Sequence, residues 1–352
     1  MVIGVDSGAI CETDDRLKVG VYRVTLELLK HLSRIDSVNT YRLYSFAPIP
    51  HEIMKNFGKN MVNISLAPSI GYMKVRLPLK LMLEPVNIFL GVAQAIPNGA
   101  KKAIGFIYDL GFLHHPEVYG VQAKALTKQT ATLVSRAEHI VTISMASKQD
   151  IVQTYGIKPE RITVCYPGVS DVFVTNGTKA VNENQYFLTV GLLKPGKNIP
   201  VAVRAFAGFL KKVNRPYDFF IIGGDMGLDP DIKKTIQEHH VQDRVHLLGF
   251  LPDNEVAKWY RGATGFIALS ETEGFCLPAV EALVSGCPVL YAQKGALPEI
   301  VDQAGIGVLL NNPQGIADAM VRLTKETFET ASQAKKYQWT TFARRVYDIL
   351  QI

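Results

Sequence analysis

The stretch SETEGFCLPAVEALVSGCPV, residues 270–289, predicts a tight turn, a complete helix and the start of a strand. An apolar run, Gly265–Leu269, leads into it, and the polar, glycine-containing residues that follow are typical of a turn. Pro278 suits the first position of a helix, and the sequence GCP at 286–288 ends that helix. Since Pro288–Ala292 is again apolar, the stretch predicts a strand–helix–strand unit whose strands are buried on both faces.

The same alternation of short apolar runs and helical spacing extends through the second half of the chain. The expected strands are Tyr186–Gly191, Asp218–Gly223, Val245–Leu248, Gly265–Leu269 and Pro288–Ala292. The expected helices are Ile199–Val213, Asp229–His240, Asn254–Arg261 and Pro278–Ser285. Because strands that alternate with helices are typical of parallel sheets with right-handed crossovers, this half predicts an open α/β sheet.

The first half repeats the alternation less regularly. Strands are expected at Val2–Val5, Tyr41–Phe46, Val86–Phe89, Ala103–Ile107 and His139–Ile143. Helices are expected at Val19–Leu32, Val121–Arg136 and Ala146–Tyr155. The two halves together predict an α/β protein of two tandem, doubly wound, Rossmann-like domains.

The boundary between the domains is expected in the segment YPGVSDVFVTNGT, residues 166–178, where Pro, Gly, Asn and Ser accumulate. We therefore predict an N-terminal domain at residues 1–168 and a C-terminal domain at 169–338, followed by an amphipathic helix at Trp339–Leu350. Open parallel sheets bind ligands at the carboxyl ends of their strands, so a ligand is expected in a cleft between the two domains.

Composition excludes several classes of protein. The chain of 352 residues is 47% hydrophobic and 20% charged, which is too apolar for a disordered protein. It contains no apolar run near the roughly 18 residues that a membrane-spanning helix needs, and its start lacks the basic leader of a signal peptide. The four cysteines, Cys11, Cys165, Cys276 and Cys287, form no CxxC pair, so neither a disulfide scaffold nor a zinc site is expected. A cytoplasmic protein with reduced thiols is the expectation.

Charge is distributed unevenly along the chain. Residues 1–168 contain 19 Lys and Arg against 13 Asp and Glu, whereas residues 169–352 contain 19 of each, so the first half carries the whole net charge of +6. A basic face of this kind attracts an anionic partner such as a phospholipid surface or a lipid phosphate, and an ordinary solvated surface with a modest bias is the alternative. Nucleic acid is not expected, because no helix-turn-helix signal, RNP-like aromatic run or block of Lys and Arg is present.

Two glutamates lie in and just after a turn whose backbone N–H groups could bind an anion. Glu273 lies in the turn and Glu281 lies one turn into the following helix, so both can point into one cleft. The backbone N–H groups of residues 274–277 and the positive end of the helix dipole make the helix start a candidate anion site.

The spacing of these residues resembles the Glu-x7-Glu signature of retaining family-4 glycosyltransferases. That signature has the form E-G-F-G-L-P-x-x-E-A, followed by G-x-P-V. The chain matches it at Glu273, Gly274, Phe275, Leu277, Pro278, Glu281, Ala282, Gly286, Pro288 and Val289, and Cys276 replaces a frequent glycine. The resemblance implies the GT-B fold, with relatives of the bacterial or archaeal mannosyltransferase type.

Other segments along most of the chain resemble elements of the same family. They are Gly20–Arg23 before the first long helix, Tyr108-Asp109-Leu110 in place of a His-Asp-Leu element, Ile143-Ser144, Gly191 through Lys197-Asn198, Val245–Phe250 with Leu251-Pro252-Asp253, and the helix containing Trp339 and Ala343. The last of these resembles the family's C-terminal helix that crosses back to the first domain, which is the acceptor side.

Roles follow from the resemblance position by position. Glu273 would bind hydroxyls of the donor sugar, Lys197 would neutralise the diphosphate, and Glu281 would accept hydrogen bonds from the ribose. Tyr108 and Asp109 would lie at the transfer centre. The remaining donor-binding positions are Gly20 and Gly191 near the diphosphate, Gly249, Phe250 and Leu251 at the base, and Gly274, Phe275, Cys276 and Leu277 at the sugar or diphosphate.

The chain departs from the family at two of these positions. Tyr108 stands where a histidine is frequent, and a tyrosine is bulkier and does not titrate near neutrality. Leu192 stands where Arg or Thr is frequent, which removes one cation unless Arg23, Lys194 or Lys294 replaces it. These departures favour either an unusual substrate or reduced catalysis.

The resemblance implies an enzyme that moves a hexose from a nucleotide-diphosphate donor, GDP-mannose or a UDP-hexose, to a glycan, lipid-linked or other hydroxyl acceptor in polysaccharide biosynthesis. No cofactor is expected, and no metal, since Lys197 and a helix start supply positive charge and no DxD motif lies between aliphatic runs. The alternative is a GT-B protein that binds sugar nucleotides with weak or no transfer activity. A third, weaker hypothesis is an epimerase or a phosphorylase of this fold.

Overall fold

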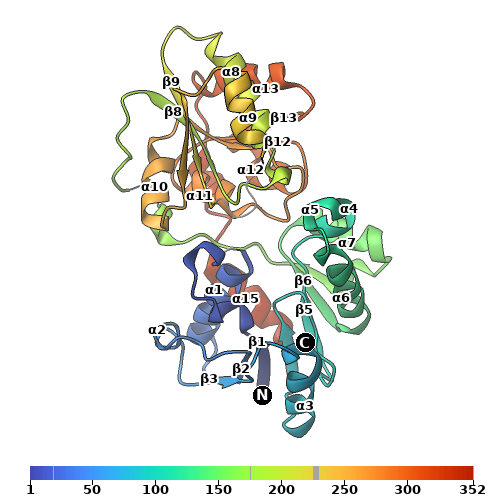
Figure 1. The fold of residues 1–352 in the computed structure, drawn as a ribbon. Coiled ribbons are helices and arrows are strands. Elements are labelled where there is room, and N and C mark those ends of the chain that lie inside the picture. Colours follow the sequence, from blue (N-terminus) through green and yellow to red (C-terminus); the bar gives the residue numbers. More distant parts are fainter. Residues whose placement is uncertain (19, 175, 225–229, 352) are drawn as a thin grey trace. The chain divides into compact units, whose positions relative to one another are not determined.

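The computed structural model describes residues 1–18, 20–174, 176–224 and 230–351. Contacts between Cα atoms divide the chain into two compact units (Figure 1). Unit 1 comprises Met1–Gly168 and Gln338–Ile352, and unit 2 comprises Val169–Tyr337. The chain thus leaves unit 1 after Gly168 and returns to it at Gln338.

Unit 1 contains a parallel sheet of seven strands in the order β3-β2-β1-β4-β5-β6-β7. The strands are β1 (Val2–Asp6), β2 (Thr40–Ser45), β3 (Met61–Ser65), β4 (Ile88–Gly91), β5 (Ala103–Phe106), β6 (His139–Thr142) and β7 (Ile162–Val164). The helices are α1 (Gly20–Ile35), α2 (His51–Met54), α3 (Leu77–Leu83), α4 (Gly111–His114), α5 (Pro116–Tyr119), α6 (Gln122–Arg136), α7 (Met145–Tyr155) and α15 (Trp339–Leu350).

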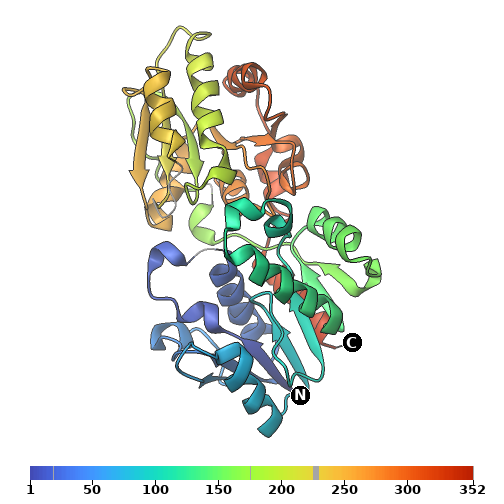
Figure 2. The same ribbon diagram turned by 45° about the vertical axis from the view of Figure 1, so that its right-hand side comes forward.

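Helix α15 completes unit 1 from the far end of the chain. It packs against α1 (Figures 1 and 2). The residues that it buries include Phe342, Val346 and Leu350. The Arg345 guanidinium donates to the Val164 carbonyl oxygen at 2.9 Å, which ties the helix to β7. The final twelve-residue helix is therefore part of the first sheet's covering layer.

Unit 2 contains a parallel sheet of six strands in the order β10-β9-β8-β11-β12-β13. The strands are β8 (Gln185–Val190), β9 (Tyr217–Ile222), β10 (Val245–Gly249), β11 (Gly265–Ala268), β12 (Val289–Ala292) and β13 (Gly305–Val308). The helices are α8 (Ile199–Leu210), α9 (Asp231–Glu238), α10 (Asp253–Gly262), α11 (Leu277–Val284), α12 (Leu297–Val301), α13 (Pro313–Leu323) and α14 (Thr330–Ala334).

Neighbouring residues of the strands in unit 2 supply two separate cores. Phe187 and Phe219 pack with α8 and α13 on one face of the sheet. Their sequence neighbours Tyr186 and Phe220 pack with α10 and α11 on the other face. Since successive side chains of a strand point to opposite faces, the continuous apolar runs of the sequence bury both sides.

The predicted α/β class with two tandem, Rossmann-like parallel sheets is confirmed. Sequence reasoning missed three strands, β3, β7 and β13, each of which lies at an edge of its sheet. The expected starts of two helices, Val19 and Asp229, lie outside the described residues. No helix in the described part of the chain combines the length and the apolarity needed to cross a membrane.

Candidate active site

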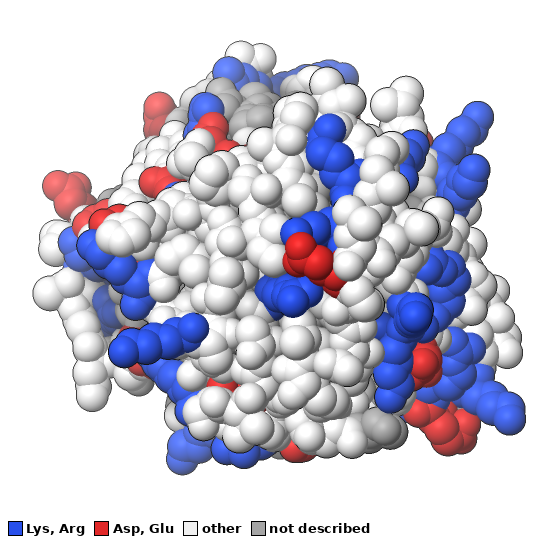
Figure 3. All heavy atoms as spheres, turned by 90° about the horizontal axis from the view of Figure 1, so that it is seen from below, with Lys and Arg blue, Asp and Glu red and all other residues white. Residues whose placement is uncertain are grey.

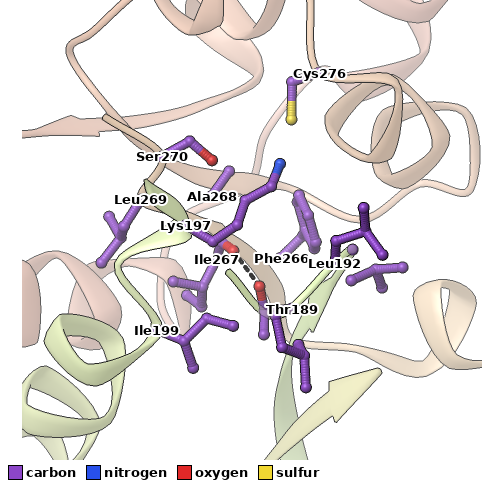
Figure 4. A pocket seen from close by; sticks show the side chains of 13 residues that line it. Thr189, Leu192, Lys197, Ile199, Phe266, Ile267, Ala268, Leu269, Ser270 and Cys276 are labelled. Atoms are coloured by element: carbon purple, nitrogen blue, oxygen red, sulfur yellow. Dashed lines mark hydrogen bonds between the residues drawn. The ribbon is translucent and has the colours of Figure 1, made fainter. Parts of the chain in front are cut away.

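In unit 2 the strand order reverses at β8, because β9 pairs with one side of this strand and β11 with the other. The chain segments that leave the carboxyl ends of β8 and β11 diverge to opposite faces, which opens a crevice where α/β proteins bind ligands. A small pocket lies there and is lined by Gly191 after β8, Ser270 after β11, and the side chains of Lys197 and Cys276 (Figure 4).

The turn after β8 brings Lys197 to this crevice. Gly191 has φ 144°, a conformation that favours glycine, and its N–H donates to the Ile222 carbonyl oxygen of the neighbouring strand at 3.0 Å. A short 3₁₀ turn, Pro195–Lys197, follows. Asn198 then adopts φ 53° and donates to the Leu269 carbonyl oxygen at 2.9 Å, so the lysine is anchored to the end of β11.

Lys197 and Glu273 meet in an ion pair. The Lys197 ammonium lies 2.5 Å from Glu273 Oε1, and the two side chains are 22% and 14% exposed. Burial raises the pKa of the Glu273 carboxyl, but the charge and hydrogen bond of Lys197, with help from Ser270 and the charge of Lys194, outweigh burial and lower this pKa below its ordinary value of 4.5. The sequence analysis placed Lys197 at the donor diphosphate and Glu273 at the adjoining sugar, and within unit 2 the two side chains are in direct contact.

Two neighbouring loops hold the backbone of the Glu273 turn. The Glu271 N–H donates to the Gly196 carbonyl oxygen, and the Ala296 N–H donates to the Glu273 carbonyl oxygen, both at 3.0 Å. A Cβ on Gly295, whose φ is 54°, would lie 2.7 Å from that same Glu273 oxygen. Sequence reasoning did not single out Gly295, because its close contact is formed by a segment more than twenty residues from the turn.

Cys276 occupies a backbone conformation that favours glycine. It has φ 73° and ψ 71° at the start of α11, and its side chain is buried. Its carbonyl oxygen accepts from the Ala279 N–H at 3.0 Å, which begins the helix. This geometry explains why glycine is frequent at the matching position of the resembled motif. Burial raises the pKa of the Cys276 thiol well above its usual range, so the side chain is a neutral part of the pocket wall.

The second glutamate of the motif, Glu281, lies one turn into α11 and is buried. The Tyr260 hydroxyl donates to Glu281 Oε2 at 3.4 Å. Gly249, with φ 70°, ends β10, and its carbonyl oxygen accepts from the Gly223 N–H at 2.9 Å. Phe250 is half-exposed, and Leu251 packs against the α10 side of the sheet. The expected base-binding stretch thus lies at the carboxyl end of a strand, as do the loops that carry Lys197 and Glu273.

The remaining predicted site residues lie in unit 1. Gly20 begins α1, and a Cβ there would meet no atom within 4 Å of its own position, so nothing in the described structure requires a glycine at this residue. The Tyr108 hydroxyl donates to the Val92 carbonyl oxygen at 2.8 Å, and burial raises the pKa of this hydroxyl above its usual range. Asp109 Oδ1 accepts from the N–H of Gly111, the first residue of α4, at 2.9 Å.

Unit 1 has its own reversal point, between β1 and β4, and sequence reasoning missed the acid located there. Asp6 ends β1 and is buried, and its Oδ1 accepts from the Tyr72 hydroxyl at 3.1 Å and the Gly8 N–H at 3.3 Å. Burial, only partly offset by these donors, raises the pKa of the Asp6 carboxyl. A polar residue directly after a predicted buried strand is the signal that points to Asp6.

Among the described residues, no group of three or more His, Cys, Asp and Glu side chains is placed to hold a metal ion. The unit 2 crevice presents the Lys197 ammonium and the N-terminal end of α11, and both suit a phosphate group.

The lowered pKa of Glu273 predicts a pH dependence of stability. The ion pair should stabilise unit 2 fully above pH 4.5, the carboxyl's ordinary pKa, and lose that contribution as the pH falls through the lower folded value. In urea titrations from neutral pH to about pH 3, Glu273→Gln should lose less stability than the wild type. Glu183→Gln, an exposed position in the same unit, should match the wild type. Equal losses for wild type and Glu273→Gln would contradict the assignment.

Comparison with known proteins agrees with this geometry. Residues 175–339, which span nearly all of unit 2, match the family model described as "Glycosyl transferases group 1". Unit 2 is a group 1 glycosyltransferase domain. The "O-antigen chain mannosyltransferase B" of Escherichia coli is 23% identical over 94% of this chain and 96% of its own length.

Solved structures show the same fold over both units. A sucrose-phosphate synthase from Thermosynechococcus elongatus has a TM-score of 0.76 at 16% identity and covers 99% of this chain and 98% of its own. Anabaena HepE, solved in complex with UDP and glucose, has a TM-score of 0.74 at 16% identity and covers 99% of both chains. The chain thus contains a group 1 glycosyltransferase domain, unit 2, has the GT-B fold over both units, and is similar to mannosyltransferases at low identity.

Proposed function

We propose that this glycosyltransferase moves a hexose from a nucleotide-diphosphate sugar to a hydroxyl acceptor, with retention of anomeric configuration and without a metal ion. The observation that carries the proposal is the Lys197–Glu273 ion pair at the carboxyl ends of β8 and β11. A cation and a carboxylate in one crevice suit a diphosphate and the hydroxyls of the adjoining sugar.

The chemistry needs negative charge stabilised on the leaving group. When the bond between the anomeric carbon and the phosphate oxygen breaks, its electron pair stays on the diphosphate. Lys197 and the start of α11 would lower the barrier because they bind the diphosphate more strongly as this charge develops. The acceptor oxygen then bonds to the anomeric carbon on the same face, and its proton passes to the departing phosphate oxygen.

Glu273 would exchange partners when the donor binds. Without ligand it neutralises Lys197. As the diphosphate takes over Lys197, the Glu273 carboxylate would accept hydrogen bonds from sugar hydroxyls, while Glu281 would accept them from the ribose. Lys194 is the best placed substitute for the cation missing at Leu192, since its charge already acts on Glu273, whereas Lys294 pairs with Glu271 at 3.5 Å.

The relatives indicate the class of donor and acceptor. The Escherichia coli relative is an O-antigen chain mannosyltransferase by name, and the Anabaena neighbour was solved with UDP and glucose. We therefore propose GDP-mannose or a UDP-hexose as donor and a glycan or lipid-linked acceptor in polysaccharide synthesis. A lipid-linked acceptor places the reaction at the cytoplasmic membrane face, and the net positive charge of residues 1–168 favours such a surface.

A donor panel tests the proposal. The wild type should be stabilised in thermal unfolding by one nucleoside diphosphate and by its sugar conjugate, and should transfer that sugar to a lipid-linked acceptor in the presence of EDTA. Product anomers identified by NMR should retain the donor configuration. Inversion would refute the stereochemical part, and loss of transfer on chelation would refute metal independence.

One outcome distinguishes the alternative function. The Tyr108 hydroxyl is already bonded to the Val92 carbonyl oxygen, and Leu192 carries no charge. A protein that binds donor tightly but shows no transfer to any acceptor would be a sugar-nucleotide-binding member of the fold rather than an active enzyme.

A further inference from the structure

The segment from Ile70 to Leu83 in unit 1 has two apolar faces, of which the fold buries only one. It consists of a loop, a π-helical turn at Tyr72–Arg76 and α3. Tyr72, Leu77 and Leu81 are buried in the core of unit 1. The opposite face exposes Val75 at 53%, Leu79 at 53%, Met82 at 71% and Leu83 at 80%, and Ile70 before it is 84% exposed.

These exposed residues form one stripe. Leu79, Met82 and Leu83 are spaced i, i+3 and i+4, and Val75 lies one turn earlier, so they share a helix face. Single exposed apolar residues are normal on a protein surface, but four within nine residues along the π-helical turn and α3, with Ile70 in the loop before them, indicate a surface that another phase or molecule covers.

Cations flank the stripe. Lys74 is exposed, Arg76 donates to the carbonyl oxygens of Leu66, Pro68 and Ile70 on the preceding loop, and Lys80 pairs with Glu84 at 2.5 Å. Arg42 lies 3.8 Å from the same Glu84 carboxylate, so four cations accompany one acid. Figure 3, which views the molecule from the side where α3 lies at the bottom of Figure 1, shows Lys and Arg side chains gathered at several places around uncharged surface.

We propose that residues 70–83 dock unit 1 on an anionic phospholipid surface, with Ile70, Val75, Leu79, Met82 and Leu83 entering the acyl boundary. Aliphatic side chains flanked by Lys and Arg are what an interfacial helix presents to acidic headgroups. The stripe contains none of the aromatic residues that dominate protein interfaces, which favours lipid over a protein partner.

The inference rests on the proposed function and adds to it a route for the acceptor. Tyr72 opens the π-helical turn, and its hydroxyl bonds to Asp6 at the carboxyl end of β1. A helix of seven residues is only about 10 Å long, so α3 keeps the proposed membrane surface close to the reversal point of unit 1. A lipid-linked acceptor held in the bilayer would reach this point without leaving the membrane.

Vesicle sedimentation tests the docking. The wild type should bind phosphatidylcholine vesicles that contain about 30 mol% phosphatidylglycerol and should bind pure phosphatidylcholine weakly. The triple variant Leu79→Ser, Met82→Ser, Leu83→Ser should lose at least about tenfold in affinity for the anionic vesicles. Lys74→Glu should lose about fivefold at low salt and less at high salt.

Matched controls separate this inference from general loss of function. Val121 and Val181 are 95% and 98% exposed elsewhere on the chain, and their double replacement by Ser should leave vesicle binding unchanged. All variants should keep the thermal shift that a nucleoside diphosphate produces. If the wild type itself showed no such shift, that result would count against the proposed function and not against the docking surface. Equal binding of wild type and triple variant, or a wild-type dimer in sedimentation velocity that the triple variant abolishes, would overturn the lipid proposal.

Discussion

Replacing Lys197 by Ala should lower kcat/KM for sugar transfer by about 10³-fold, since removing one donor to a developing negative charge costs about 10²–10³ and Lys197 carries a full charge. The loss should appear mainly in kcat, because the charge on the diphosphate grows as the glycosidic bond breaks. Steady-state kinetics with the donor found in the panel, at saturating acceptor, measures both parameters.

The control for this variant is Lys179→Ala, an exposed lysine in the same unit, which should keep wild-type kinetics. Circular dichroism and thermal unfolding of Lys197→Ala check that the fold survives, since Glu273 loses its partner. Activity of Lys197→Ala within about threefold of the wild type would remove the lysine from the leaving-group site.

Replacing Gly223 by Ala should destabilise unit 2 by about 3 kcal/mol, the upper part of the range for an overpacked core. A Cβ at this residue would lie 1.8 Å from the Gly191 carbonyl oxygen, so the ends of β8 and β9 must separate. Because Gly191 begins the turn that carries Lys197, binding of a nucleoside diphosphate should weaken together with stability. Urea unfolding and the ligand-induced thermal shift measure the two effects.

The adjacent glycine supplies the matched control. A Cβ on Gly224 would meet no atom within 4 Å, so Gly224→Ala should change stability by less than about 0.5 kcal/mol. If Gly223→Ala were as stable as Gly224→Ala, the backbone contact between Gly191 and Gly223 would not position the lysine turn.

All three strands that sequence reasoning missed lie at sheet edges, although one edge strand, β10, was predicted. The runs YFLTV at 186–190 and DFFII at 218–222 lie in the interior of the second sheet and are apolar on both faces, so their pattern is strong. The missed strands β3, β7 and β13 are edge strands of three to five residues with polar or glycine residues among them. Edge strands are short and partly solvated, which weakens the apolar signal.

The residues of the candidate site also fall into those that the sequence predicts and those that only the structure shows. Lys197 and Glu273 were predicted from the family resemblance, Glu273 through the specific Glu-x7-Glu spacing and Lys197 through the turn that starts at Gly191. Gly295 and Gly223 could not be predicted, because their roles depend on contacts with Glu273 and Gly191 that only the folded backbone forms. Asp6 was missed although it is the last residue of β1, since a single acid at a strand end carries no distinctive spacing.

The most direct test of whether the crevice after β8 and β11 holds the β-phosphate is isothermal titration calorimetry. A nucleoside diphosphate and the matching nucleoside monophosphate are each titrated, in EDTA, into the wild type and into Lys197→Ala. The wild type should bind the diphosphate at least about tenfold more tightly, and Lys197→Ala should lose this preference. The same preference in both proteins would contradict the account.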